Sequence, residues 1–475
     1  MRFASLVTSL NPVSHSHMLR TVPSRNSQLQ LSSHFLDDDW KMHNIVLACR
    51  ELKQSHTASY MAELIREIMD EYSIHLYIAS CADGASNMKC LVDKQLEALY
   101  VHCGAHVLHL CLEFAMKEWK GRDAIVSLKQ FVTKLHKSPS LVKKYAVAQM
   151  EEGKNAIGIP MPIPTRWNST WNMLRVVVDA KSSTTRFNCV NACIDDDTDK
   201  ISDESQLLLK KAFKFLEKFE AETRHLSCNT TTASELVPSL MTLLNHCDDF
   251  AKETGGIEDL ALLVRGQLAK RHSDYLNSEG ILFALFFDQR FVTAENILPL
   301  NKREQAITIV LSKADQFRLD NPPTTAPASL LPEACRYASL LSSNMVATRD
   351  NDIRLEINTY VNICNRDIRY KMMSPSDFWR SNACNFPLLS PLARAALSIP
   401  ASSTASERLF NYVGLNVTDR RGSLKPENLD GILVYGLNDI SDQCRTISAN
   451  NEEPVDISEY ATLSDESIQN RAMND

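Results

Sequence analysis

Residues 386–437 read FPLLSPLARAALSIPASSTASERLFNYVGLNVTDRRGSLKPENLDGILVYGL. The stretch is rich in apolar residues at helical spacing, and the carboxylate of Glu407 lies near its middle. Pro426 falls near the first turn of the last expected helix, where proline is favoured. Thr404 to Glu407 form a capping-box pattern, so the simplest role for Glu407 is structural. We expect the apolar side chains to be buried, either in the core or against a second copy of the chain.

Composition is typical of a globular protein with two or three domains. Hydrophobic residues make up 44% of the 475 residues and charged residues 23%. Only 13 glycines occur, which favours helices over turn-rich β structure. Most of the net charge of −7 comes from residues 441–475, which hold eight acids and two arginines. A nucleic-acid partner would therefore have to be met by a local basic patch.

The cysteines and the apolar runs indicate the cellular compartment in which the protein is expected. Thirteen cysteines are scattered without framework spacing, which fits a reducing compartment better than secretion. The N-terminus has no clear signal-peptide cleavage site. The longest apolar run, residues 281–287, is too short to cross a bilayer. We expect a soluble intracellular protein without a membrane partner.

Strand and helix signals alternate in the first part of the chain. Two strand-like segments lie within residues 28–52, and a helical pattern follows at 57–72. The apolar run 74–80 reads as another strand, and a further helix is expected from about Ala85. This order predicts an α/β layer with a mixed sheet. Residues from about 183 to 370 are nearly all amphipathic helix, which predicts an inserted helical domain.

Asp83 follows the strand expected at 74–80 and precedes a helix. Carboxylates at the carboxyl ends of strands in an α/β sheet face the crevice where ligands and metals bind. Two or three of them can hold Mg²⁺ ions for phosphodiester chemistry. The structural alternative is that Asp83 caps the helix that starts near Ala85.

Two further motifs have both a functional and a structural interpretation. Cys103 and His106 have half of a zinc-site spacing, but no second pair lies nearby, so a buried thiol and a hydrogen-bonded imidazole are the simpler interpretation. Arg166 and Trp167 follow a proline-rich stretch, with Trp171 one turn later. An Arg–Trp pair can contact a phosphate and stack on an extruded base. The alternative is that one or both tryptophans belong to a helix core.

The order of these blocks resembles that of hAT-superfamily transposases, over about residues 24–440. The blocks that carry the resemblance are HFLDDDWKMHNIVLACRELKQSHT (34–57), CADGASNM (81–88), VHCGAHVLHL (101–110), PTRWNSTWNML (164–174) and SIPASSTASERLF (398–410). The resemblance implies an α/β ribonuclease-H-like domain interrupted by a long all-α insertion, predominantly helical overall. Asp83 matches the second catalytic Asp, Glu407 the catalytic Glu, and Trp167 the tryptophan associated with a flipped base.

The same resemblance sets the expected domain boundaries and the self-association surface. The expected parts are an irregular N-terminus at 1–23, the two parts of the ribonuclease-H-like domain at 24–182 and 371–440, the all-α insertion at 183–370, and an acidic disordered tail at 441–475. Residues 371–440 include the family's dimerisation region. Its expected apolar contacts are Leu409, Phe410, Leu429, Ile432, Leu433 and Leu437.

One departure from the family pattern concerns the first catalytic Asp. The family places it on the first strand, where this chain reads residues 17–22, HMLRTV, and no acid occurs in residues 1–36. Asp83 and Glu407 alone would form an incomplete triad and hold metal weakly. The family's BED zinc finger is also missing from the sequence. We therefore expect that the protein does not cleave DNA strands. If it were active, Mg²⁺ is the only cofactor that we would expect it to need.

The sequence leads to a hypothesis with two rivals. We expect a transposase-derived, catalytically inactive nuclear protein that forms a homodimer or higher oligomer, with weak DNA association through Arg166 and Trp167 and without a small-molecule substrate. The first rival is an active, Mg²⁺-dependent DNA transposase whose first Asp and zinc finger are missing from the gene model. The second rival is a helical interaction protein with no nucleic-acid role, which a buried Trp167 would favour.

Overall fold

The computed structural model describes residues 15–22, 28–74, 77–163, 166–178, 186–320 and 349–404. These residues divide into two compact units. Unit 1 takes its described residues from Met1–Val107, His225–Ser239 and His272–Arg445, and unit 2 takes them from Leu108–Arg224 and Leu240–Arg271. Each unit is therefore assembled from segments that are distant in sequence.

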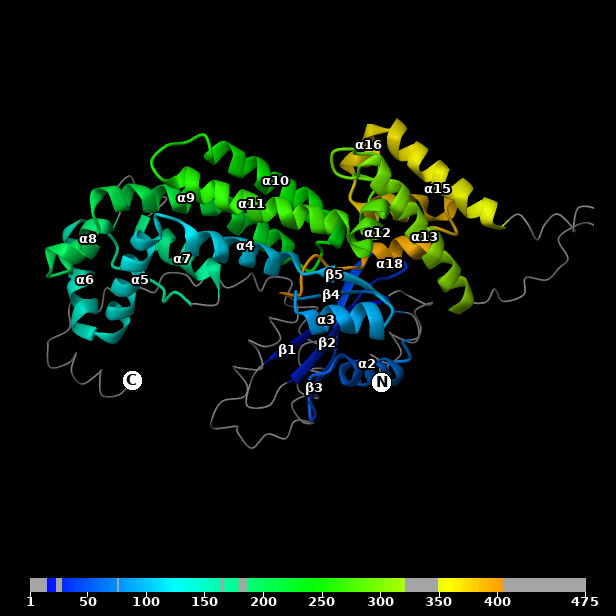
Figure 1. The fold of residues 1–475 in the computed structure, drawn as a ribbon, viewed down its shortest axis with the longest axis horizontal. Helices are drawn as coiled ribbons and strands as arrows, with labels where there is room; N and C mark the ends of the chain where they lie inside the picture. The colour runs from blue at the N-terminus through cyan, green and yellow to red at the C-terminus, as the bar shows by residue number, and fades with distance from the viewer. Residues whose placement is uncertain are drawn as a thin grey trace, which may run out of the picture. The chain divides into compact units, whose positions relative to one another are not determined.

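Unit 1 contains a mixed sheet with the strand order β3-β2-β1-β4-β5, shown in Figure 1. Its strands are β1 (His15–Val22), β2 (Gln28–Leu36), β3 (Met42–Glu51), β4 (Tyr77–Ala82) and β5 (Leu99–His102). Strands β1, β2 and β3 are antiparallel neighbours, whereas β4 runs parallel to β1, and β5 runs parallel to β4. The sequence predicted β2, β3 and β4 close to these bounds.

Strand β1 corrects the expectation that residues 1–23 are irregular. Residues 15–22 pair with β2 on one side and with β4 on the other. Their sequence, HSHMLRTV, has only a short apolar stretch and weak alternation. The hydrogen bonds to two flanking strands make this segment a central strand, and no local sequence signal reports such long-range pairing.

The helices nearest the sheet come from the connections between its strands. Helix α2 (Ala58–Glu71) is capped by Thr57, whose side chain accepts a hydrogen bond from the amide of Tyr60. Helix α3 (Ser86–Cys90) continues into a π-helical turn, Leu91–Gln95. Side chains of α2, α3 and this turn form one buried cluster with β2 and β3, including Leu29, Leu31, Leu47, Ile65, Ile68, Met88 and Leu91. This cluster fixes the α/β layer.

Helices make up most of the described chain after β5. They are α4 (Gly104–Glu118), α5 (Arg122–Lys137), α6 (Pro139–Glu151), α7 (Trp167–Val178), α8 (Phe187–Ala192), α9 (Asp203–Leu226), α10 (Leu236–Phe250), α11 (Ile257–Leu276), α12 (Glu279–Phe287), α13 (Leu300–Asp320), α15 (Arg349–Arg366), α16 (Ile368–Met372), α17 (Pro375–Asn382) and α18 (Ser390–Leu397).

Helix α12 is the centre of the helical part of unit 1. Every residue from Gly280 to Phe287 is buried, which explains why the sequence there is apolar all round. The indole of Trp379 donates to the carbonyl of Phe287 at 2.9 Å, and the hydroxyl of Tyr360 donates to the carbonyl of Phe286 at 3.1 Å. Among the described helices, none is long and apolar enough to span a membrane.

Unit 2 is helical and has its own core. The indole of Trp119, which is fully buried, donates to the carbonyl of Gly256 at 2.8 Å. Trp171 of α7 stacks on Phe213 of α9 with ring centroids 5.6 Å apart. The first contact links the end of α4 to the loop before α11, and the second links α7 to α9.

Candidate functional site

Asp83 is the first residue after β4, at the carboxyl end of a central strand. It is half-buried, and its Oδ1 atom accepts a hydrogen bond from the amide of Ala85 at 3.3 Å. Its backbone carbonyl accepts the hydroxyl of Tyr100 at 2.6 Å. The N-cap of α3 is Ala85, which makes no side-chain cap bond. Asp83 therefore closes the turn before α3 and does not act as its N-cap, so the capping alternative is wrong.

The strand beside Asp83 carries no acid. In the β1–β4 register the last pair is Leu19 with Ala82, the residue that precedes Asp83. None of the residues of β1 is Asp or Glu. A metal ion held by Asp83 would need a second carboxylate from another part of the chain.

A histidine lies against the turn that follows Asp83. A Cβ atom at Gly84 would meet the Nε2 atom of His102 at 2.7 Å, so only glycine fits there without a shift of the imidazole. The ring of His102 lies 5.9 Å from that of His106, centroid to centroid. The turn and the first turn of α4 are thus brought together at one end of the sheet.

The thiol of Cys103 is an acceptor at the N-terminus of α4. It is fully buried and accepts the amide of Ser403 at 3.2 Å. The thiol of Cys81 donates to it and, with the bond from Ser403, lowers the pKa of Cys103 although burial opposes this. Within the described ranges, no group of three or more His, Cys, Asp or Glu residues is arranged to hold a metal. The zinc interpretation of Cys103 and His106 gains no support.

Residues 399–404, which lead toward Glu407, are fastened on several sides. Their backbone forms a short antiparallel bridge with residues 231–233. The bonds run from Ala233 N to Ile399 O at 2.8 Å, from Ala401 N to Thr231 O at 3.0 Å, and from Gly104 N to Ala401 O at 2.9 Å. The hydroxyl of Thr404 also donates to that of Ser227 at 3.3 Å. The start of the segment is therefore fixed beside Cys103.

Several predicted site residues lie outside the described residues. These are Glu407 and the dimerisation residues Leu409, Phe410, Leu429, Ile432, Leu433 and Leu437. The structure consequently does not give a distance between Asp83 and Glu407, and both assignments stay predictions.

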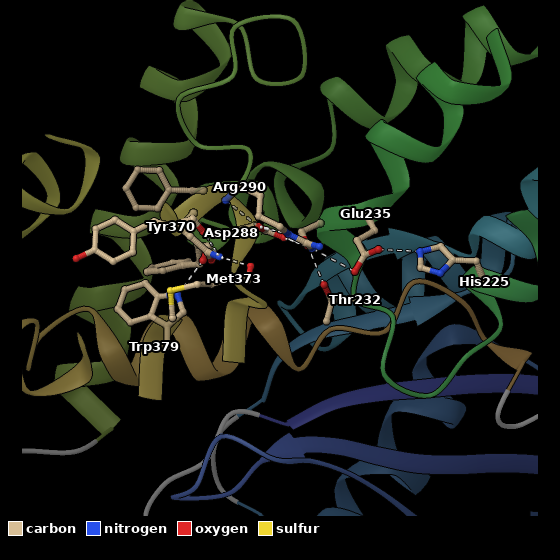
Figure 2. A network of polar contacts seen from close by, with 12 residues as sticks. His225, Thr232, Glu235, Asp288, Arg290, Tyr370, Met373 and Trp379 are labelled. Carbon is tan, nitrogen blue, oxygen red and sulfur yellow. Dashed lines mark hydrogen bonds and ion pairs between the residues drawn. The ribbon is translucent and has the colours of Figure 1, made fainter. Parts of the chain in front are cut away.

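Figure 2 shows a partly buried charge network that the sequence did not predict. Asp288 is fully buried and receives two bonds from the guanidinium of Arg290, at 2.9 and 2.7 Å, and one from the hydroxyl of Ser234 at 2.7 Å. The same guanidinium reaches Glu235 at 3.2 Å, and Glu235 also contacts the Nε2 atom of His225 at 2.7 Å. The network ties residues 225–235 to the turn that follows α12.

The ionised forms of Glu235 and Arg290 are favoured by their partners in this network. Burial opposes ionisation of Glu235, but the hydrogen bond from His225 and the charge of Arg290 outweigh it and lower the pKa of Glu235. Burial likewise opposes the charge of Arg290, yet Asp288 and Glu235 raise its pKa. The only sequence signal was an acid and a base two residues apart after an apolar run, which does not reveal the distant partner Glu235.

Gln289, between the two charged residues of the turn, holds helix α16. Its Nε2 atom donates to the carbonyls of Tyr370 at 3.0 Å and Met373 at 2.9 Å. Figure 2 shows these two residues on the opposite side of Asp288 from Glu235. The charge network and the position of α16 are therefore linked through one turn of the chain.

In unit 2, Arg166 is exposed and Trp167 is buried, with 3% of its surface exposed. Trp171 is also buried, and the guanidinium of Arg175 lies 5.7 Å from its ring centroid. The amide of Ile163 donates to the hydroxyl of Ser169 at 2.8 Å, which fastens the preceding extended segment to α7. The burial of Trp167 fits the core interpretation, and its role in base stacking stays a prediction.

Three family models match the chain. Residues 20–106 match the ZBED1 RNase-like domain, residues 101–215 the ZBED1 RNase-like helical domain, and residues 356–435 the hAT family C-terminal dimerisation region. Along the chain, the three matches follow the same order as the sequence blocks that resemble the family.

Curated proteins from fungi, animals and plants are similar to this chain over most of its length. The putative transcriptional regulator tpeD of Talaromyces stipitatus is 22% identical over 87% of this chain and 52% of its own length. Zinc finger BED domain-containing protein 4 of Homo sapiens is 21% identical over 75% of the chain and 30% of its own length. The putative AC transposase of Zea mays is 22% identical over 86% of this chain and 54% of its own length. The chain thus spans about half the length, or less, of these relatives.

Proposed function

We propose, from the premise that this chain is an hAT-family transposase-derived protein, that it acts as a self-associating protein with an incomplete set of catalytic carboxylates. The strand order β3-β2-β1-β4-β5, with three antiparallel strands followed by two parallel ones, supports a ribonuclease-H-like domain. We assign the helices of unit 2, from Leu108–Arg224 and Leu240–Arg271, to an insertion in this domain, while the expected bounds 183–370 stay a prediction.

The observation that carries the proposal is the register beside Asp83. Metal-assisted phosphodiester cleavage needs two or three carboxylates around a common point. The neighbouring strand β1, whose Leu19 pairs with Ala82, contains no acid along its described length. Asp83 and Glu407, if they meet, would therefore form an incomplete site.

Self-association is proposed because residues 356–435 match the family's dimerisation region. We assign the contacts to apolar residues of the C-terminal stretch, including Phe410 and Leu433. Light scattering on the purified chain at micromolar concentration tests this assignment. A mass of two or more chains is expected, and a mass of one chain at every concentration would refute it.

DNA association and a nuclear location are the remaining parts of the proposal. They rest on the family relationship and on the exposed Arg166. Binding that depends on phosphate contacts weakens as salt rises, because counterions compete for the phosphates. Replacing Arg166 by Ala should reduce the affinity for duplex DNA and the salt dependence together. Equal binding by both proteins would exclude Arg166 as a phosphate contact.

A further inference from the structure

Helix α16 has an apolar face that none of the described residues covers. Ile368 is 72% exposed and Met372 is 85% exposed, the two highest exposures among the large hydrophobic residues described. The two residues are four positions apart on one helix, so their side chains lie on the same face. Single exposed apolar residues are common, but such a pair on one rigid face marks an interaction surface.

The helix is held firmly from its inner side. Gln289, itself fully buried, donates to the carbonyls of Tyr370 and Met373, and the ring of Tyr370 packs edge-on against Phe378 at 5.1 Å. Asp367 caps the first turn by accepting the amide of Arg369 at 2.9 Å. A face that is already ordered loses little conformational entropy on binding.

We propose that this face of α16, formed by Ile368 and Met372, is part of the surface through which two copies of the chain associate. The inference rests on the proposed self-association and specifies where it occurs. The helix lies within residues 356–435, the stretch that matches a dimerisation region. The other large apolar residues that are more than half exposed lie outside it: Leu207, Leu262, Leu300 and Leu355.

The charges around α16 suit a two-fold contact between identical surfaces. Asp367 and Arg369 stand on either side of Ile368 in the sequence and form an ion pair, with Arg369 Nη2 2.7 Å from Asp367 Oδ2. In an isologous contact each copy presents both signs to the other, so Asp367 of one protomer can face Arg369 of its partner. Two side chains bury too little area for a stable dimer, so this face adjoins a larger contact.

The test compares full-length variants by light scattering over a dilution series. The double variant Ile368→Ser, Met372→Ser removes the apolar face, and Leu207→Ser, Leu262→Ser is the matched control, because those residues are 56% and 54% exposed in unit 2. We expect the dimer dissociation constant of the α16 variant to rise at least about tenfold, while the control equals the unchanged protein. At a concentration at which every protein is monomeric, the unfolding temperature of both variants should equal that of the unchanged protein.

The possible outcomes distinguish the assignment to α16 from the proposal that the chain self-associates. If the unchanged protein is monomeric throughout, self-association itself fails. If it is dimeric and the α16 variant dimerises equally well, the assignment to α16 is wrong while self-association stands. If, with all proteins monomeric, the α16 variant unfolds at a markedly lower temperature than the control, the face is covered by the same chain, which also overturns the inference.

Discussion

His34 of strand β2 should make the stability of unit 1 depend on pH. The imidazole is 1% exposed, and among the described residues neither ring nitrogen has a hydrogen-bond partner. Burial alone lowers the pKa of His34 from 6.5 to about 4. The Oδ1 atom of Asn44, the residue paired with His34 on β3, is likewise buried without a partner within the described ranges.

The sign and size of the effect follow from the two pKa values. The unfolded chain takes up a proton below about pH 6.5, whereas the folded chain does so only near pH 4, so acid favours unfolding within this window. A difference of 2.5 pKa units corresponds to a limit of about 3.4 kcal/mol. At about pH 5 the loss relative to neutral pH is about 2 kcal/mol.

The assay is urea unfolding of the unchanged protein and of His34→Phe, which keeps a ring but cannot titrate. Burial also lowers the pKa of His246 and His272, so only the difference between the two proteins isolates His34. We expect that difference to shift by about 2 kcal/mol in favour of the variant between neutral pH and about pH 5. Parallel loss of stability in both proteins would refute the assignment of a buried, unpartnered imidazole.

Three substitutions test other contacts of unit 1. Gly104→Ala places a methyl group into occupied space at the start of α4 and should lower the free energy of unfolding by about 1–3 kcal/mol, measured by chemical denaturation. An unchanged denaturation midpoint would show that the neighbouring side chains move aside without cost. Arg290→Leu leaves the carboxylate of Asp288 buried without its cation and should lower the free energy of unfolding by about 3–5 kcal/mol. A decrease below about 1 kcal/mol would contradict the network. Cys103→Ala removes the acceptor of the Ser403 amide, so hydrogen exchange at that amide should accelerate, and unchanged protection would disprove the bond.

Much of the sheet could be predicted from the sequence, because β2, β3 and β4 carry their own apolar patterns. Strand β1 has no such pattern, and only the family resemblance, which placed the first strand at residues 17–22, indicated it. The position of Asp83 after β4 was predicted correctly, but its turn bond to Ala85 replaces the expected helix cap. These differences arise where long-range or local backbone contacts override weak sequence signals.

The charge network and the anchored segment 399–404 lay beyond sequence reasoning for a different reason. Glu235 and Arg290 are 55 positions apart, and Cys103 and Ser403 are 300 positions apart. Side chains at such separations meet only through the tertiary fold. Trp167 illustrates the opposite case, because its place in a helix core was among the alternatives that the sequence itself offered.

The central claim is that Asp83 has no carboxylate partner on the neighbouring strand and supports no strand cleavage. The most direct measurement is the conversion of supercoiled plasmid to nicked circles in Mg²⁺ or Mn²⁺, comparing the unchanged chain with Asp83→Asn and with Asp93→Asn as a matched control. The account predicts that all three proteins leave the plasmid intact beyond the buffer background. Metal-dependent nicking by the unchanged chain and by Asp93→Asn, lost in Asp83→Asn, would contradict it.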